Sequence, residues 1–451
     1  MKLKIKILFA FLVGVNLITF SQIDYRRSSL TMVLIENDDL GKNKKLVIDA
    51  YNANPFPEKY NEHLISDKKF DTKQIKLNAS DYLASGFYKD TLKTAKDFLL
   101  AKKKPFNKIR YVKADSSLAI LEPTEKELTQ IYLDKYIKDK NLAKQSVATW
   151  FNRTPQGDMD WKLIQQRGMY SASTEKLEGA KEMADPSSFL QDFELIGNTY
   201  TAFNKMDFYS NEPVARVVRD LAKAQAINQF AGKPAALLTK ALDGLDVVYE
   251  KTKEGYTVLC NTYLYQLDWN DTIAQKTKAM FFNDNVTFDK NKAWDTTTLF
   301  KMKFVGKTSN TSIVTFKIGE KRTEEQIIDL QVRRTMDNAL CNLQKEYVQF
   351  RPIAPISTIS PLTTKIGIKE GVEPGQKYEI LKLKEDAMGI FKLERVEVVS
   401  VPKKKPIWDN RQGADQEPLM DKEGMPIVTP EFTTFSGGKK AKETYYIRLI
   451  K

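Results

Sequence analysis

Histidine is the residue type that most restricts the chemistry of this 451-residue sequence, because it occurs once, at His63. A Ser-His-Asp or Cys-His site would have to use it, and no G-x-S-x-G motif supplies a serine partner. His63 follows Pro55, Pro57 and Asn61 in a polar stretch, which is typical of a surface loop. A zinc site of the HExxH type needs two histidines and is excluded.

Two cysteines, Cys260 and Cys341, are the candidates for thiol chemistry. Two such distant cysteines cannot form a structural zinc site unaided. In an oxidising compartment they could form a structural disulfide, which would stabilise the fold by about 4 kcal/mol in the chain-entropy model because the closed loop is long. Each could equally be a small buried hydrophobe, since Cys260 lies in an expected strand and Cys341 in an expected helix. The spacing leaves both alternatives open.

Paired carboxylates could support glycoside hydrolysis, because the acid pair of a glycosidase needs no fixed sequence spacing. The candidate groups are Asp38-Asp39, Asp158 with Asp160, Asp268 with Asp271, and Asp284 with Asp289. Each lies at a turn or a helix start, where aspartate commonly caps the backbone, and capping is the interpretation we prefer. The stretch after Asp289 lacks the glycine and the terminal glutamate of a calcium loop, so no metal site is expected.

Two further patterns imitate binding sites. Gly306-Lys307-Thr308 resembles the end of a P-loop, but Lys301 occupies the position of the first glycine, whose backbone freedom phosphate binding requires. No G-x-G-x-x-G motif occurs, and no cofactor is expected.

Five tryptophans could form a sugar-stacking platform, but scattered tryptophans usually belong to cores. They are Trp150, Trp161, Trp269, Trp294 and Trp408.

The amino terminus predicts export. Three lysines within residues 1–6 precede an apolar run over 7–15, and Thr19 and Ser21 occupy the −3 and −1 positions of a cut before Gln22. The apolar run falls short of the ~20 residues that span a bilayer, and no later stretch is apolar enough to do so. We therefore expect an exported chain, periplasmic or associated with the outer membrane, that has no transmembrane span once mature.

The charge balance bears on partners. The formal net charge is +13, and removal of the signal peptide takes away three lysines and no acidic residue, which leaves +10. A basic exported protein could contact anionic lipid, glycan or an acidic partner, for example through the lysines of 102–104 and 402–406. Adjacent loop lysines are more often simply solvated. Nucleic acid is not expected as a partner outside the cytoplasm.

Hydrophobic periodicity predicts a chain of mixed helices and strands. Valines and a leucine recur at helical spacing after Pro213, so Val214, Val217, Val218 and Leu221 predict an amphipathic helix. Short apolar runs predict strands at 28–36, 108–112, 118–121, 195–203, 256–269, 299–305 and 313–318, the last two as a pair joined by a polar turn.

Capping-box spacing of Thr323 and Gln326 opens the clearest helix, whose apolar side over residues 328–343 predicts packing against a core. After several prolines the sequence becomes rich in strand patterns, with glycines at the expected turns. We expect a small β-barrel or sandwich there. Its strands are predicted at 365–369, 378–383, 390–401 and 444–450.

These elements predict an α+β fold, with a mixed α/β body of two subdomains followed by the small C-terminal β-barrel or sandwich. The loop at 150–160 and the prolines after residue 351 mark the boundaries. The expected division is a signal peptide at 1–21, an N-terminal α/β domain at 22–149, a central α/β domain at 150–350 and a C-terminal β-rich domain at 351–451.

Segments spread over most of the chain resemble exported proteins of Bacteroidetes that are uncharacterised. They are YRRSSLTMVLIE, PFPEKYNEH, IQQRGMYSAS, ELIGNTY, TYLYQLDWND and IGIKEGVEPGQKYEIL. The last segment is also similar to the small β modules that end some envelope accessory proteins. The resemblance implies an envelope location in a Gram-negative cell, and it implies no activity.

Without a catalytic, cofactor or metal signature, the sequence predicts a non-enzymatic periplasmic or outer-membrane-associated protein. Such a protein would act as a binding or scaffold protein through contacts with envelope proteins. The alternative is a carboxylate-dependent glycan hydrolase or a glycan-binding protein, which the unassigned acidic groups leave open.

Overall fold

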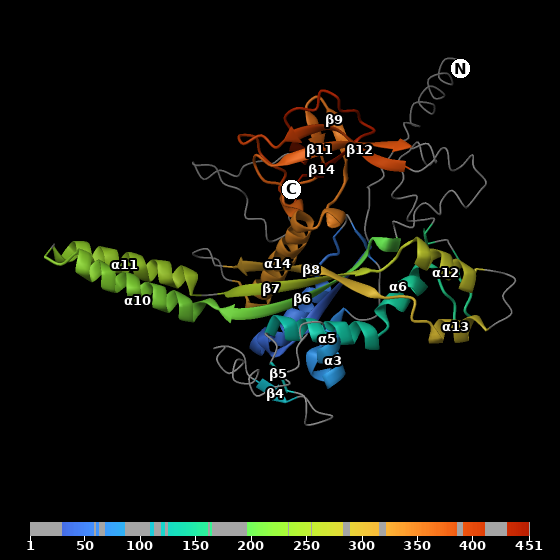
Figure 1. Ribbon diagram of the computed structural model, residues 1–451. Helices are drawn as coiled ribbons and strands as arrows, with labels where there is room; N and C mark the ends of the chain where they lie inside the picture. Colours follow the sequence, from blue (N-terminus) through green and yellow to red (C-terminus); the bar gives the residue numbers. More distant parts are fainter. Residues whose placement is uncertain are drawn as a thin grey trace, which may run out of the picture.

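The computed structural model has an α+β fold, in which a mixed sheet covered by helices on both faces is followed by a small antiparallel sheet (Figure 1). The predicted fold class is confirmed. The signal peptide lies outside the described residues and stays a prediction. The structure describes residues 29–57, 60–62, 68–85, 109–111, 119–121, 125–160, 163–164, 196–232, 234–253, 255–282, 289–314, 322–385, 391–410 and 431–450.

The first sheet has the strand order β2-β1-β6-β7-β8, and β3 also pairs with β1. β1 runs parallel to β2, β3 and β6, whereas β7 is antiparallel to both β6 and β8. The strands predicted over 28–36 and 256–269 are confirmed as β1 and β7. The bounds are β1 (Ser29–Glu36), β2 (Asn61–Glu62), β3 (Lys69–Asp71), β6 (Thr199–Ser210), β7 (Tyr256–Leu267) and β8 (Met302–Ile313).

The division expected between residues 149 and 150 does not separate two bodies. β1 belongs to the first expected domain and β6 to the second, yet the two pair from Ser29 opposite Thr199 to Ile35 opposite Lys205. A short apolar run predicts that a strand is buried but not which strand it pairs with. The two segments therefore build one sheet and one body.

One face of this sheet is covered by α2 (Lys44–Ala53) and α14 (Glu324–Glu346). The predicted capping box opens α14: the Thr323 hydroxyl accepts from the backbone N–H of Gln326 at 3.2 Å, and the Gln326 side chain accepts from the Thr323 N–H at 2.9 Å. The predicted core-facing side of α14 is confirmed. Its residues pack into a cluster that includes Leu34, Val47, Tyr51, Met206, Val258, Ile328, Val332 and Met336.

The opposite face is covered by α5 (Glu125–Asp139) and the start of α6 (Leu142–Trp150), with α3 (Ala79–Ala84) beside α5. Beyond α6, the helices α12 (Asp271–Phe281) and α13 (Lys290–Thr296) close an aromatic cluster at the end of β7. The tryptophans at 150, 269 and 294 are buried in that cluster, and the Trp150 indole N–H donates to the Thr199 hydroxyl at 2.7 Å.

The polar turn expected between the strands at 299–305 and 313–318 is wrong, and residues 315–318 of the second expected strand lie outside the described residues. The structure has one continuous strand, β8, which pairs with β7 from Met302 opposite Leu267 to Ile313 opposite Thr257. The polar sequence in its middle, GKTSNTS, is typical of a turn, but the pairing of strand backbones does not require apolar side chains. A bulge near Gly306 shifts the register once without ending the strand.

The second sheet is antiparallel, with the order β12-β11-β14-β9-β10-β13, and it begins where the boundary after residue 350 was expected. The strand expected at 365–369 is wrong, because the Glu370 carboxylate accepts from the Gly367 N–H at 2.7 Å and closes a 3₁₀ turn, η5 (Ile368–Glu370). The bounds are β9 (Ala354–Ile359), β10 (Leu362–Thr364), β11 (Lys377–Glu385), β12 (Phe391–Ser400), β13 (Thr433–Thr434) and β14 (Tyr446–Leu449).

The remaining elements are short, apart from two long helices between β6 and β7. A two-stranded pair, β4 (Ile109–Tyr111) with β5 (Ala119–Leu121), agrees with the strands expected there. The long helices are α10 (Asn211–Gln229) and α11 (Ala235–Thr252). The 3₁₀ turns of the body are η1 (Asp38–Asn43), η2 (Thr72–Gln74) and η4 (Val348–Phe350).

A partly buried carboxylate joins α5 to the sheet. The Tyr265 hydroxyl on β7 donates to the Asp134 carboxylate on α5 at 2.6 Å. Burial raises the pKa of Asp134 and outweighs the opposite effect of this hydrogen bond. The ionised form of Asp134 is therefore less favourable in the folded chain than in the unfolded chain.

The raised pKa of Asp134 predicts a pH dependence of stability. Because folding raises this pKa, the contribution of Asp134 is most favourable below the ordinary carboxyl pKa of about 3.9, and it is lost as the pH rises through the raised value. Asp134→Asn keeps an acceptor for Tyr265 and removes the charge. As the pH rises from acidic to neutral, we expect the free energy of unfolding of Asp134→Asn, measured with urea, to fall less than that of the unsubstituted chain. Parallel profiles would contradict this account.

Candidate binding surface

The two cysteines do not form a site. Cys260 lies in the middle of β7, buried under α2 and α14, and its sulfur is 3.7 Å from the Thr262 hydroxyl. Burial raises the pKa of the Cys260 thiol to about 12, and it raises that of the half-buried Cys341 thiol as well. Both thiols are free. The disulfide alternative is therefore corrected: Cys260 packs in the core under the helices, whereas Cys341 lies on α14 beside Lys345 and beside Gly371, the residue that follows η5.

Four of the candidate carboxylates have local contacts, and one of them, Asp38, pairs with the Lys73 ammonium at 2.6 Å. Asp289 caps α13, accepting from the N–H groups of Asn291 and Lys292. Asp271 lies in the first turn of α12, where it complements the helix dipole. Asp160 accepts from the Asn152 amide at 2.9 Å. These positions fit the capping and turn interpretation better than an acid pair.

The motif that imitates a P-loop does not have the structure of one. Gly306-Lys307-Thr308 lies inside β8 rather than before a helix, so it cannot cradle a phosphate as a P-loop does. Among the residues that the structure describes, no three His, Cys, Asp or Glu side chains gather as a metal site would require. His63, Trp161, Asp284 and the lysines of 102–104 lie outside the described residues.

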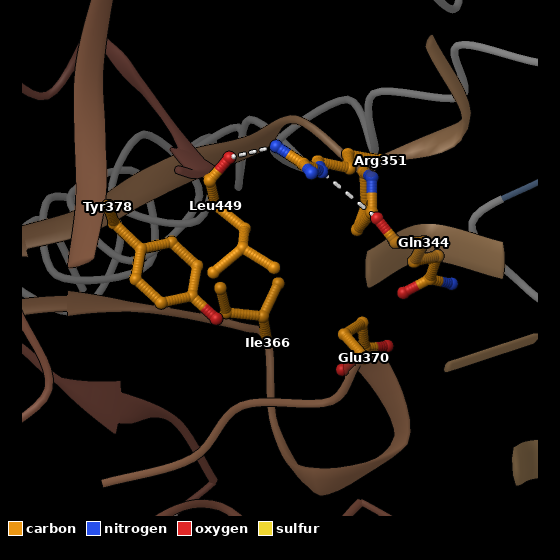
Figure 2. A pocket seen from close by; sticks show the side chains of 7 residues that line it. Gln344, Arg351, Ile366, Glu370, Tyr378 and Leu449 are labelled. Atoms are coloured by element: carbon orange, nitrogen blue, oxygen red, sulfur yellow. Dashed lines mark hydrogen bonds between the residues drawn. The ribbon is translucent and has the colours of Figure 1, made fainter. Parts of the chain in front are cut away.

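A small cavity lies at the junction of the two sheets (Figure 2). Its volume is about 10 Å³, and it is lined by Gln344, Arg351, Pro352, Ile366, Glu370, Tyr378 and Leu449. Such a volume holds about one water molecule and no organic ligand.

The chemistry around this cavity is that of a joint between the sheets. The buried Arg351 guanidinium donates to the carbonyls of Gln344 and Lys345, at 3.1 and 2.8 Å, and so caps the C-terminal end of α14. It also donates to the Leu449 carbonyl on β14 at 3.1 Å. One side chain thereby links the helix over the first sheet to the second sheet, and the cavity is a consequence of that packing.

Among the residues that the structure describes, the most exposed large apolar side chains lie elsewhere, on α10 and α11. Figure 1 shows the two helices side by side, projecting from the ends of β6 and β7 away from both sheets. We call this helical hairpin, residues 211–252, the arm. Its seam includes the buried Ala215 and Ala226.

Polar contacts mark one side of the arm. The Lys223 ammonium is 2.7 Å from the Asp246 carboxylate, which pairs α10 with α11. The Tyr249 hydroxyl donates to Glu212 at 3.0 Å, and the Arg219 guanidinium lies 4.2 Å from the centre of the Tyr249 ring. These contacts fix how the two helices face each other.

The opposite side of the arm is apolar. An α-helix turns 100° per residue. Because Lys223 and Asp246 meet on one side of the arm, the positions 180° from them on α10 and on α11 both lie on the other side. On α10 this side carries Val214, Val218 and Leu221, which are 59–65% exposed, and the polar Gln225 and Asn228 follow them on the same side. We call this set the arm face. It consists of Val214, Val218 and Leu221 on α10, and Leu237, Ala241, Gly244 and Val248 on α11.

The arm is held firmly at its root. Asn211, buried at the start of α10, donates its side-chain N–H to the Val314 carbonyl at 3.2 Å and accepts from the Thr257 hydroxyl at 2.7 Å. Its backbone N–H donates to the Gly255 carbonyl at 3.1 Å. Gly255 has φ +98°, and a side chain there would collide with the Val314 carbonyl oxygen. The arm face is therefore presented by a defined support.

The two helices of the arm differ in how well they were predicted. Hydrophobic periodicity after Pro213 indicated an amphipathic helix, and α10 confirms it. α11 was not predicted, although Leu237, Ala241, Gly244 and Val248 have helical spacing. Periodicity finds an apolar face, but it does not tell whether another element covers it.

The comparisons with known proteins do not indicate what the arm face binds, so it is interpreted from its chemistry. No model of a known protein family matches the chain, and no significant match to a curated protein is found. None of the helices in the described ranges is long and apolar enough to cross a membrane.

The contacts at the arm root give a testable prediction. Asn211→Ala leaves the buried Val314 carbonyl without its side-chain donor, so we expect the chain to lose about 1–3 kcal/mol of stability. Amide hydrogen exchange should become faster at residues 255–258. Asn228→Ala, on the exposed part of the same helix, is the matched control and should change little. Equal effects of the two substitutions would show that the root contacts are not important.

Proposed function

We propose that this chain is a non-enzymatic binding or scaffold protein that acts through protein–protein contacts made by the arm face. The observation that carries the proposal is the exposure of Val214, Val218 and Leu221, at 65, 59 and 63%, on a helix that projects from the body. A contiguous exposed apolar patch of this kind marks an interaction site in soluble proteins. Burying these side chains against a partner would remove them from water.

A protein partner suits this surface better than a lipid surface does. Interfacial membrane helices combine a Lys/Arg-rich polar side with large Trp, Phe and Leu side chains on the apolar side. On the arm, Lys223 is paired with Asp246 and Arg216 with Glu212, so these cations are neutralised within the arm. The arm face consists mainly of short Val, Ala and Gly side chains. This composition is that of a helix-packing surface.

The proposed location is the cell envelope of a Gram-negative bacterium, either the periplasm or the outer membrane, with envelope proteins as partners. The export pattern at residues 1–21 and the resemblance to exported proteins of Bacteroidetes support it. Weak contact with anionic lipid or glycan through the exposed lysines at 403–405 is compatible with this location. Recovery of the uncleaved chain from the cytosol of its native host would contradict it.

The alternative function, a glycan hydrolase or glycan-binding protein, gains no specific support. Asp289 caps α13, Asp271 lies in the first turn of α12, Asp160 accepts from Asn152, and three of the five tryptophans are buried in a core. The arm face is therefore the surface on which we base the function.

Photo-crosslinking in cells that export the chain tests the proposal. A photoreactive residue at Val218 should capture a protein partner, because Val218 lies in the arm face. The matched control is Ile227, which is 52% exposed on the same helix. It lies nine residues away, two and a half turns, and so on the opposite side. We expect a several-fold higher yield of crosslinked protein from position 218. Equal yields, or no product from either position, would contradict the proposed function.

A further inference from the structure

The joint between α14 and the second sheet contains a buried acceptor that no described side chain satisfies. The side-chain oxygen Oε1 of Gln344 has no hydrogen-bond partner among the described residues. Gln344 is only 4% exposed, and it lines the cavity of about 10 Å³ at this joint. A buried acceptor without a donor is unfavourable, so such atoms in native proteins are nearly always paired with the chain or with an ordered water.

We propose that this cavity is the binding site of one structural water molecule, which joins Gln344 on α14 to Arg351 and to Glu370 on η5. The inference goes beyond the proposed function and is independent of it, because none of these residues belongs to the arm.

The groups that line the cavity select a neutral molecule that both donates and accepts hydrogen bonds. The Arg351 guanidinium repels a cation, whereas the Glu370 carboxylate and the Gln344 oxygen repel an anion. The remaining lining includes apolar side chains such as Ile366 and Leu449, which supply no charge. The volume admits about one water molecule and nothing larger.

The polar lining also supplies enough partners, since a buried water makes two to four hydrogen bonds. The Gln344 oxygen is one acceptor. The Arg351 guanidinium has five N–H groups, and its described bonds to three carbonyls use three of them, so it can donate to a water as well.

Glu370 supplies the other acceptor. Its Oε2 atom accepts from the Gly367 N–H at 2.7 Å and from the Asn410 amide at 2.6 Å, which holds the carboxylate in place. A carboxylate has about four lone-pair sites, so these two bonds leave capacity for a water. Figure 2 shows the Gln344 and Glu370 side chains on the same side of the cavity. One water can therefore donate to both acceptors and accept from Arg351.

This water gives the joint a buried connection besides Arg351. Two ion pairs also link α14 to the region around η5, Lys345 with Glu373 and Lys369 with Asp337, and both are partly exposed. Water-mediated bonds are nearly as favourable in enthalpy as direct ones. Because the water needs acceptors from two elements at once, it favours a single alignment of η5 on α14.

A crystal structure of the full chain, at a resolution that shows ordered water, is the direct test. We expect a water within about 3.2 Å of Gln344 Oε1 and of an Arg351 guanidinium nitrogen. The competing arrangement is a reversed Gln344 amide, whose Nε2 donates straight to Glu370. A reversed amide, or a joint without an ordered water, would overturn the inference.

Magnetic relaxation dispersion of ¹⁷O water tests the site in solution, because it counts the waters that stay inside a protein for longer than nanoseconds. Gln344→Met removes the uncharged acceptor, and its flexible thioether fills part of the cavity. We expect this variant to hold one long-lived water fewer than the unsubstituted chain. Gln229→Met, the same change at an exposed position of α10, is the matched control and should leave the count unchanged.

An equal count in the unsubstituted chain and in a folded Gln344→Met variant would show that no such water is bound there. If Gln344→Met does not fold, the crystal structure of the unsubstituted chain still decides between a bound water and a reversed amide.

Discussion

The antiparallel pairing of β6 with β7 is the interaction on which the rest of the structure is built. It runs without a break from Tyr200 opposite Gln266 to Ser210 opposite Tyr256. Alternate side chains of this ladder point to opposite faces, so one pair of strands supplies both cores: Met206 and Val258 under α14, and Phe203 and Tyr263 under α5. Its far end carries the arm, so a binding surface and the packing of the body depend on the same backbone hydrogen bonds.

α14 then couples this body to the second sheet. Its first turns are fixed by the Thr323 capping box and its last carbonyls by the Arg351 guanidinium, which also donates to β14. Buried polar groups along the helix, such as Gln331 donating to the Ser312 carbonyl at 2.8 Å, set its position on β8. In any other alignment of the helix these buried polar groups would lose their hydrogen-bond partners, which is unfavourable. The contact therefore specifies one packing arrangement as well as adding stability.

Local signals in the sequence predicted those elements whose cause is local. The apolar runs of β1 and β7 and the capping box of α14 can be recognised in the sequence because the residues that form each element also show its pattern. β8 was missed in its middle because the neighbouring strand, and not its own Thr and Ser side chains, holds GKTSNTS extended. β1 and β6 share a sheet because residues about 170 positions apart pair with each other. The arm face is exposed because none of the described elements covers Val218. Neither fact is contained in a local window of sequence.

The position of the arm within the β6–β7 ladder has a consequence for how such a chain can change over evolutionary time. Ser210 and Tyr256 face each other as the last pair of the ladder, so the 45 residues between them occupy the place of an ordinary hairpin turn. Domain insertions are tolerated best at such loop ends, where no core contact is broken. Lengthening, shortening or exchanging the segment would leave the body intact. The body can therefore serve as a constant platform for appendages of differing specificity.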